Sequence, residues 1–387
     1  MTVVFWVTTA LLFYTYLAYH LILVVAVRLK EVFGKNPDTS QKDFGEPDTP
    51  LVSIIIAAYQ EEKTIQRRIE NLLSLDYPKD KLEIIVASDG STDRTVEIAR
   101  QFENEGIKVL DFKENRGRAA VHNSAAKIAK GEIFIFTDAE TEFQNDFLKA
   151  IVRMFKNPKL GVGAGELVIK ARNTPIGETG VFYSGIERKQ RYYEYRLGIL
   201  PFASGACFCI RKELWEDIPA HSDIDNVLPL RVIEKDFSVF YCKDAVAFDY
   251  AVSERRQFFR ARYRTALRSM TDILSEVPRL AKKRKFGVLF ALFSHRLLRW
   301  WGSLLLPVIF FSNLSLLDKG FLYWGIFACQ LGLNGLALVG YLQDRFGFPR
   351  IFSRIPGASY SFLLSNIAFV WAVINYLLGK KITAYRR

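Results

Sequence analysis

The stretch LVSIIIAA at Leu51–Ala58 decides the fold class of the middle of this 387-residue chain. It is a continuous apolar run rich in β-branched residues, which is typical of a strand buried on both faces of a sheet. Similar short runs follow at Leu82–Ala87, Ile107–Phe112 and Ile133–Thr137. The intervening segments have helical spacing, at Glu61–Leu73, from Thr92 onward and at Arg118–Lys130. This alternation predicts an α/β domain with a doubly wound, mostly parallel sheet.

Long uncharged segments flank this domain. Val3–Val27 has 25 residues without Asp, Glu, Lys or Arg, and as a helix it would be about 37 Å long, enough to cross a bilayer core of about 30 Å. It lacks the basic start and the cleavage site of a signal peptide. Three further uncharged segments are Trp300–Leu317, Gly320–Leu342 and Ile355–Gly379. We therefore expect one N-terminal and two to three C-terminal transmembrane helices.

Positive charge is concentrated beside the predicted membrane segments. The chain has a net charge of +12, and residues 253–299 alone hold 13 Lys or Arg against three acidic residues. This position favours contact with anionic lipid over nucleic acid, and it predicts a cytoplasmic middle domain at the cell (inner) membrane. With three C-terminal spans, however, the basic tail would emerge outside. Either the positive-inside rule fails here, or one segment, such as Phe286–Trp301, lies in the interface.

The composition and the missing motifs exclude several protein classes. Half of the residues are apolar, which excludes a disordered chain, and four cysteines exclude a disulfide scaffold. No dinucleotide-binding GxGxxG and no P-loop motif is present. The predicted plan is a membrane anchor at 1–28, a linker at 29–50, the α/β domain at 51–252, basic interfacial helices at 253–299, transmembrane helices at 300–379 and a basic tail at 380–387.

Carboxylates follow three of the predicted strands. Asp89 and Asp93 come after the second strand, and Asp93 has the position of a helix cap. Asp138 and Glu140 follow the fourth strand, and alternate residues of an extended chain point the same way. Because ligands bind beyond the carboxyl ends of such strands, this pair predicts a site for a hard divalent cation that also holds a diphosphate.

Six motifs in this order resemble those of the membrane-bound family 2 glycosyltransferases, inverting enzymes of the GT-A fold. They cover the domain from about Leu51 to Arg264 and are Ala58-Tyr59-Gln60-Glu61, Ser88-Asp89-Gly90-Ser91-Thr92-Asp93, Asn115-Arg116-Gly117-Arg118, Thr137-Asp138-Ala139-Glu140, Ser204-Gly205-Ala206 and Asp223-Ile224-Asp225-Asn226-Val227-Leu228.

The resemblance implies a role for each motif. Nucleotide-sugar binding falls to Ala58, Tyr59, Glu61, Asp89, Arg118 and Asp138. Asp138 and Glu140 would bind Mg²⁺ or Mn²⁺, although the family usually has a second Asp at the position of Glu140. Arg118 stands where many members have Lys, and either cation can pair with a diphosphate. The donor or acceptor sugar would contact Ser204, Gly205, Asp223 and Arg262.

The implied reaction transfers a sugar from a nucleotide sugar, a UDP-sugar, to a hydroxyl of a lipid-linked or polysaccharide acceptor. Asp225 would be the general base, whereas helix capping is the alternative role for Asp223 and Asp225. Polymer synthases of the family have a Gln-x-x-Arg-Trp motif, and here the corresponding stretch is Phe259–Tyr263, with only Arg262 retained. This difference predicts a non-processive enzyme.

Three alternatives remain. The acceptor could be a polyprenyl phosphate, the enzyme could be a processive polysaccharide synthase, or the chain could be an inactive membrane scaffold. The arginines of the region around Phe259–Tyr263 have a second interpretation as contacts to lipid headgroups, which suits all of them except Arg262. They are Arg255, Arg256, Arg260, Arg264 and Arg268.

Overall fold

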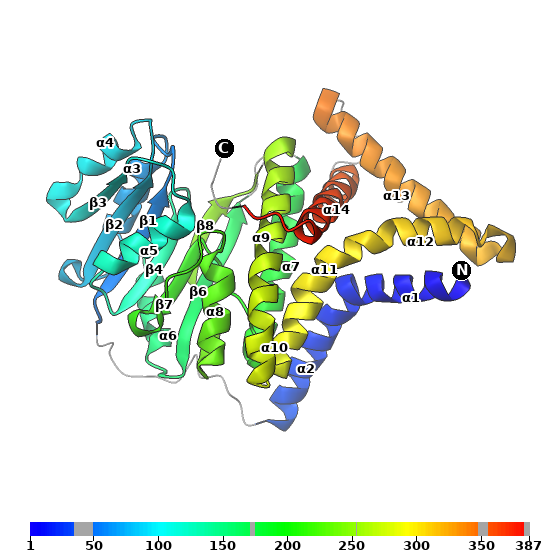
Figure 1. Cartoon of the computed structure of the whole chain (residues 1–387), viewed down its shortest axis with the longest axis horizontal. Helices are drawn as coiled ribbons and strands as arrows, with labels where there is room; N and C mark the ends of the chain where they lie inside the picture. Colours follow the sequence, from blue (N-terminus) through cyan, green and yellow to red (C-terminus); the bar gives the residue numbers. More distant parts are fainter. Residues whose placement is uncertain (35–48, 171–174, 253, 347–354, 383–387) are drawn as a thin grey trace.

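The computed structural model describes residues 1–34, 49–170, 175–252, 254–346 and 355–382 (Figure 1). Most of the expected linker (35–48) and of the expected basic tail (383–387) lies outside the described residues. The described chain has a sheet domain on one side and long apolar helices on the other, with two further long helices between them (Figure 1).

The described strands form one eight-stranded mixed sheet in the order β3-β2-β1-β4-β7-β6-β8-β5. They are β1 (Val52–Ala58), β2 (Leu82–Asp89), β3 (Ile107–Phe112), β4 (Ile133–Asp138), β5 (Glu142–Phe143), β6 (Leu160–Lys170), β7 (Cys207–Arg211) and β8 (Ser238–Tyr250). The first four strands pair in parallel, and β7 runs antiparallel to both β4 and β6. The α/β class and the four strands expected from the sequence are confirmed.

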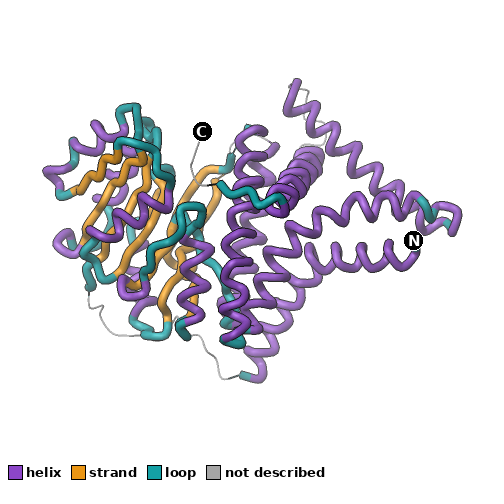
Figure 2. Tube along the Cα trace, in the orientation of Figure 1, coloured by secondary structure: helices purple, strands orange, loops and turns teal. Residues whose placement is uncertain are grey.

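Helices flank the strands (Figure 2). They are α3 (Ile65–Leu73), α4 (Thr95–Arg100), α5 (Arg118–Ile128), α6 (Phe147–Phe155) and α8 (Ile224–Glu234). Contacts connect α5 with β1 and β2, and α6 and α8 with β6 and β8. The side chains of Ile54, Ile55 and Ile56 are fully buried. Successive side chains of a strand point to opposite faces, so β1 is covered on both, as its apolar run predicts.

Two long helices stand between the sheet and the apolar helices. They are α7 (Pro175–Leu197) and α9 (Arg255–Lys282). Contacts connect α7 with β6 and β8 on one side and with α2 and α14 on the other, and α9 lies between α8 and α14 in the same way. The sheet domain and the apolar helices are therefore joined through α7 and α9. Helix α9 lies within the helical region predicted at 253–299, whereas α7 was not predicted from the sequence.

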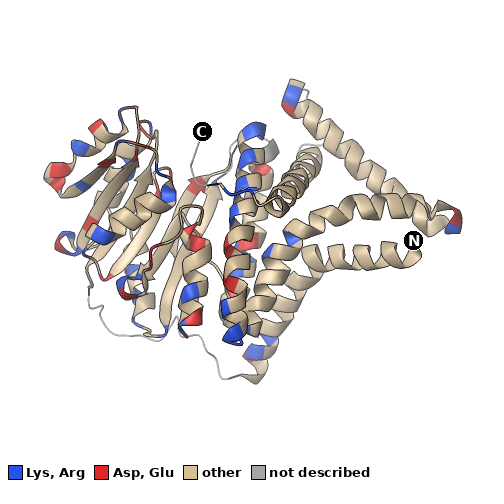
Figure 3. Ribbon diagram, viewed as in Figure 1, with Lys and Arg blue, Asp and Glu red and all other residues tan. Residues whose placement is uncertain are grey.

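Four helical segments are long and apolar enough to cross a membrane: Thr2–Phe33, Phe286–Leu314, Phe321–Phe346 and Ile355–Leu377. The first contains α1 (Thr2–Phe13) and α2 (Tyr19–Phe33), and the second contains α10 (Phe286–Ala291), α11 (Leu298–Trp301) and α12 (Leu305–Leu314). The last two are α13 and α14. Figure 3 shows that charged residues gather on the sheet domain and on α9, whereas α1 and α12 are almost without them. One N-terminal and three C-terminal candidate spans agree with the prediction.

The second span begins 14 residues before the predicted Trp300, and its charged side chains do not lie at the membrane surface as expected for Phe286–Trp301. His295 Nδ1 lies 2.7 Å from Glu194 Oε1, and Arg299 Nη1 lies 3.0 Å from Glu187 Oε2. Both glutamates belong to α7, and His295 and Arg299 are buried. The charges are thus neutralised inside the protein, and this allows the apolar segment to start at Phe286.

The described C-terminal end lies against the sheet domain. Ile382 packs on the main hydrophobic core. Burial, and then the nearby charges of Lys381 and Arg268, lower the pKa of His221, which precedes α8. Figure 1 accordingly places the C-terminal end beside the sheet, on the opposite side of the molecule from the α12–α13 connection. The chain therefore returns to the sheet domain after α14.

Candidate active site

The carboxyl ends of β1, β2 and β4 lie side by side at one edge of the sheet. In the parallel register, Ala57 is opposite Asp138 and Ala58 is opposite Ser88. The polar residues that follow each strand therefore share one rim, as expected from their positions in the sequence. Ala58 itself is only 1% exposed, so its side chain belongs to the core and only its backbone can face a nucleotide.

The loops after β1 and β2 are fastened to each other by Gln60. Its backbone has φ 59°, and its N–H donates to Ser91 Oγ at 3.1 Å. Its side-chain Oε1 accepts the N–H groups of Thr92 and Asp93, both at 3.1 Å. Tyr59 and Glu61, which flank Gln60, are partly exposed. The structure thus leaves these two side chains at the rim, where their predicted contact with a nucleotide base is possible.

Asp89, at the end of β2, braces the loop that precedes α5. Its Oδ1 accepts the N–H of Arg116 at 2.7 Å and its Oδ2 accepts the N–H of Gly117 at 3.0 Å. Burial raises the pKa of Asp89 more than these hydrogen bonds lower it. Gly90 next to it has φ +71°, and a Cβ there would lie 2.6 Å from the carbonyl carbon of Glu114. Asp89 therefore helps to place Arg118, and its predicted contact with a nucleoside remains a prediction.

Arg118 and Asp138 form an ion pair across the rim, between the start of α5 and the end of β4. Glu140 is placed differently from the expectation. The strand ends at Asp138 and a turn begins at Ala139, so the alternation of an extended strand does not continue to Glu140. Glu140 is exposed. The strand geometry from which the pairing of Asp138 and Glu140 was predicted therefore does not reach Glu140.

The residues present fit a divalent cation only in part. Among the described residues, no three His, Cys, Asp or Glu side chains are grouped closely enough to hold a metal ion. Mg²⁺ in nucleotide sites, however, commonly takes one or two carboxylates and completes its shell with phosphate oxygens and water. Asp138 offers one such carboxylate, already facing the cation Arg118. The protein thus supplies part of a site that a diphosphate would complete.

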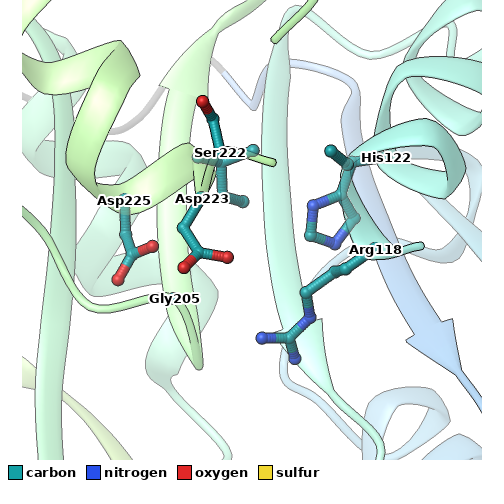
Figure 4. Close-up of a pocket in the computed structure, with 8 residues that line it drawn as sticks. Arg118, His122, Gly205, Ser222, Asp223 and Asp225 are labelled. Atoms are coloured by element: carbon teal, nitrogen blue, oxygen red, sulfur yellow. The ribbon is translucent and has the colours of Figure 1, made fainter. Parts of the chain in front are cut away.

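A small pocket lies beside this ion pair. It is lined by Arg118, Ala119, His122, Gly205, Ser222, Asp223, Ile224 and Asp225. Figure 4 shows the carboxylates of Asp223 and Asp225 on one side and the side chains of Arg118 and His122 on the other. The structure therefore brings together three elements: α5, the segment before β7 and the start of α8.

The environment of Asp225 makes it a weaker acid than an ordinary aspartate. Burial, and then the negative charge of Asp223, raise the pKa of Asp225 to about 6, against the lowering effect of Arg118. A carboxylate with such a pKa is a better proton acceptor near neutral pH. Gly205 lies directly against it, since a Cβ on Gly205 would be 3.4 Å from Cγ of Asp225. Ser204, which precedes Gly205, is buried in the turn before β7.

Helix α9 contributes buried charges behind this pocket. Arg268 is 2% exposed and its Nη2 lies 3.2 Å from Asp223 Oδ1. The interpretation of Arg268 as a contact to lipid headgroups is therefore wrong. Asp223, expected to cap α8, makes no capping hydrogen bond with its side chain and pairs with Arg268 instead.

The sequence profile described as "Glycosyl transferase family 2" matches residues 53–218, which contain the rim and half of the residues that line the pocket. Asp223 and Asp225 lie beyond the matched residues. The middle of the chain therefore holds a glycosyltransferase family 2 domain. A solved structure described as "Mannosyltransferase PcManGT from Pyrobaculum calidifontis in complex with GDP-Man and Mn2+" shares the fold with a TM-score of 0.67 at 20% identity. The similarity covers 97% of this chain and 99% of that one, so the two proteins share their fold over nearly the whole length of both chains.

Two relatives add to this comparison. The "Poly-beta-1,6-N-acetyl-D-glucosamine synthase" of Staphylococcus epidermidis is 32% identical over 170 residues, which are 43% of this chain and 41% of the relative. The "Probable glycosyltransferase YdaM" of Bacillus subtilis (strain 168) is 26% identical over 322 residues, 78% of this chain and 76% of the relative. The match to the first relative therefore spans less than half of that protein's length.

Arg262 lies apart from the pocket. It is on α9, and its guanidinium lies over the rings of Tyr183 and Phe258, with centroid distances of 4.7 and 5.1 Å. It is not one of the residues that line the pocket. A contact between Arg262 and a sugar would thus need an acceptor long enough to extend from the pocket along α9.

Sequence reasoning missed several residues around the pocket. His122 lies four residues after Arg118 on α5, and this spacing places both on one helix face. That signal was available. Arg268 and Asp272 of α9 gave no such signal, because nothing in a helix rich in basic residues indicates which of them face inward.

Proposed function

We propose that this chain is an inverting glycosyltransferase that moves a sugar from a UDP-sugar to a hydroxyl of a lipid-linked or polysaccharide acceptor at the membrane. The observation that carries the proposal is the pocket with Asp225 on one side and Arg118, paired to Asp138, on the other. These are a proton acceptor and a cation, which transfer from a nucleoside diphosphate to a hydroxyl requires.

In the proposed reaction the acceptor oxygen attacks the anomeric carbon of the donor. The new C–O bond forms as the bond to the diphosphate breaks, and the acceptor proton goes to the carboxylate of Asp225. Arg118 stabilises the charge that develops on the diphosphate. Asp138 is the residue that would hold Mg²⁺ or Mn²⁺, and the ion would supply further charge neutralisation when bound. Attack from the side opposite the diphosphate inverts the configuration of the sugar.

The donor and the product length are the finer parts of the proposal. The polymer named for the S. epidermidis relative is built from N-acetylglucosamine, which supports UDP-N-acetylglucosamine as the first donor to test. The same name favours a second candidate, a processive polysaccharide synthase. We prefer addition of one sugar or a few, because Trp of the polymerising motif is replaced by Tyr263, which offers a smaller stacking face.

The proposed location of the catalytic domain follows from the distribution of positive charge along the chain. Residues 253–299 hold most of the net positive charge, which supports a cytoplasmic catalytic domain at the cell membrane. A cytoplasmic site would meet nucleotide sugars directly and a lipid-linked acceptor at the bilayer surface.

A donor screen of the purified full-length protein tests the proposal. Release of nucleoside diphosphate is measured with UDP-N-acetylglucosamine, other UDP-sugars and GDP-mannose, each with Mg²⁺ or Mn²⁺ and with a membrane lipid extract as the source of acceptor. We expect release from one UDP-sugar, and loss of release in Asp225→Asn. No release and no nucleotide binding with any donor would support the inactive scaffold instead.

A further inference from the structure

The segment that carries Asp225 is attached to α9 through one buried carboxylate. Asp272 Oδ2 accepts the backbone N–H of Asp223 at 3.0 Å and lies 3.5 Å from Nδ2 of Asn226. Asp272 is 1% exposed. Since Asp223 and Asn226 stand on either side of Asp225, one carboxylate fastens both flanks of the proposed general base.

A buried arginine one turn earlier on α9 makes a second attachment. Arg268 Nη2 donates to the carbonyl oxygen of Ser222 at 2.9 Å and lies 3.2 Å from Asp223 Oδ1. Buried ionised groups are expensive unless they are paired and hydrogen-bonded. The position of Arg268 is therefore tied to the position of Ser222 and Asp223, and a shift of one requires a shift of the other.

Helix α9 is itself packed against the membrane helix α14 (Figure 1). The segment that carries Asp225 thus rests on a helix that also contacts the apolar helix α14.

We propose that Arg268 and Asp272 are positioning residues that hold the Ser222–Asn226 segment, so that the carboxylate of Asp225 stays aimed at the acceptor hydroxyl. The proposal rests on the proposed function, in which Asp225 is the base. Arg268 and Asp272 act through the backbone and Asp223, and neither lines the pocket. Arg268 and Asp272 thus connect helix α9 to the segment that carries the proposed base, Asp225.

The first test measures backbone hydrogen exchange in the full-length protein in lipid nanodiscs. Asp272→Leu removes the acceptor for the N–H of Asp223, and Arg268→Gln removes the charge that pairs with Asp223. In both variants we expect exchange in peptides covering Ser222–Asn226 to rise by at least about fivefold, the equivalent of one hydrogen bond. Exchange in the strands of the sheet should stay unchanged. Arg256→Gln is the matched control, because Arg256 is exposed on the same helix.

The second test measures turnover and nucleotide affinity separately. A misplacement of a catalytic group by about 1 Å can cost about 10²-fold in rate, so we expect kcat of Asp272→Leu and Arg268→Gln to fall by about that factor. The Kd for UDP with Mn²⁺ should stay at the wild-type value. Asp272→Asn keeps one acceptor oxygen and Arg268→Lys keeps the charge, so both conservative variants should recover most of kcat.

The outcomes separate the two proposals. If Asp225→Asn turns over like the wild type, Asp225 is not the base and the positioning role falls with it. If Asp225→Asn is slow while Asp272→Leu and Arg268→Gln match the wild type in exchange and in kcat, only the positioning role is wrong. A rise in exchange across the whole domain, with weaker binding of UDP, would indicate a general structural role and would also contradict the proposal.

Discussion

Arg118 pairs with the carboxylate of Asp138, which is also the carboxylate that a divalent cation would bind. The ion pair with Arg118 holds this carboxylate of Asp138 at the rim. A diphosphate carries the opposite charge to Arg118, so binding of a nucleotide sugar gives Arg118 a second partner. Asp138 would then be available to share its charge with an ion bound to the same diphosphate.

The first prediction concerns this metal. We expect turnover to require Mg²⁺ or Mn²⁺, Asp138→Ala to abolish it, and Glu140→Ala to reduce it much less, because Glu140 is exposed in the turn after β4. Nucleoside diphosphate release is measured with each ion and with excess EDTA. Full turnover in EDTA, or equal losses in the two variants, would contradict this assignment.

Asp138 and Glu140 also show which features of single residues could be predicted from the sequence and which could not. The apolar strand correctly predicts that Asp138 lies at the rim. The point at which the strand stops was not predictable, since the turn at Ala139 depends on local backbone geometry. Asp225 was placed in the pocket by resemblance, whereas its raised pKa depends on burial by elements distant in the sequence.

At the scale of elements, the connection between β2 and α4 is built around Asp93. This carboxylate accepts the N–H of Thr95 at 3.1 Å and the N–H of Glu62 at 3.2 Å. Asp93 therefore holds the first residue of α4 from one position before the N-cap, which is Arg94 and not, as the sequence predicts, Asp93. It also fastens the loop after β1. Burial raises the pKa of Asp93 less than these hydrogen bonds lower it, so the net shift is downward.

The second prediction follows from these hydrogen bonds. Asp93→Ala should destabilise the domain by about 1 kcal/mol, as the loss of a cap does, and Asp93→Asn should cost less because it keeps an acceptor. The lowered pKa means that this stabilisation is present above the unfolded value of 3.8 and is lost as the pH falls through the lower folded value. Thermal unfolding at neutral and acid pH measures it, and an unchanged Tm at pH 7 would disprove this stabilising role.

The second apolar segment shows a feature that the sequence did not predict, namely where the helix begins. The sequence places the start of the second span at Trp300 because His295, Arg296 and Arg299 make the preceding stretch look interfacial. Their acidic partners Glu187 and Glu194 come from α7, more than 90 residues away. Pairing over such a distance cannot be found by scanning hydropathy, so the apolar pattern predicted that the helix exists but missed its first 14 residues.

At the scale of the whole molecule, the C-terminal end decides the topology. The charge of Lys381 acts on His221 of the sheet domain, so the described C-terminal end lies close to that domain. We therefore expect an even number of crossings between the two, so that one of the three C-terminal segments long enough to span does not cross. Helix α14, which packs against α7 and α9, is our candidate for that segment. This expectation agrees with the positive-inside rule, which favours basic residues on the side of the sheet domain.

The third prediction tests this topology. A single cysteine added after Arg387 should react with a membrane-impermeant maleimide only from the side on which the catalytic domain is labelled. A cysteine replacing Asp318, in the α12–α13 connection, should react from the other side and serves as the matched control. The chain without its own exposed Cys329 is the background for both. Labelling of the tail together with Asp318→Cys would contradict the topology.

The fourth prediction concerns product length. Few C-terminal helices surround the pocket side, and α13 is only 11% buried along its apolar stretch, so one chain offers little enclosure for a long polymer. We expect products with one added sugar or very few when donor is in excess, sized by mass spectrometry. A ladder of many added sugars at early time would show a processive synthase.

The central claim is that Asp225 accepts the proton of the acceptor, and the kcat of Asp225→Asn tests it most directly. Asn keeps the size of the side chain but cannot take the proton, and a general base contributes about 10²- to 10⁴-fold. We predict a fall in kcat within that range, an unchanged Kd for UDP, and loss of the acid limb that wild-type kcat shows as the pH falls below about 6, the pKa of Asp225. Wild-type kcat in Asp225→Asn, with the acid limb retained, would contradict the account.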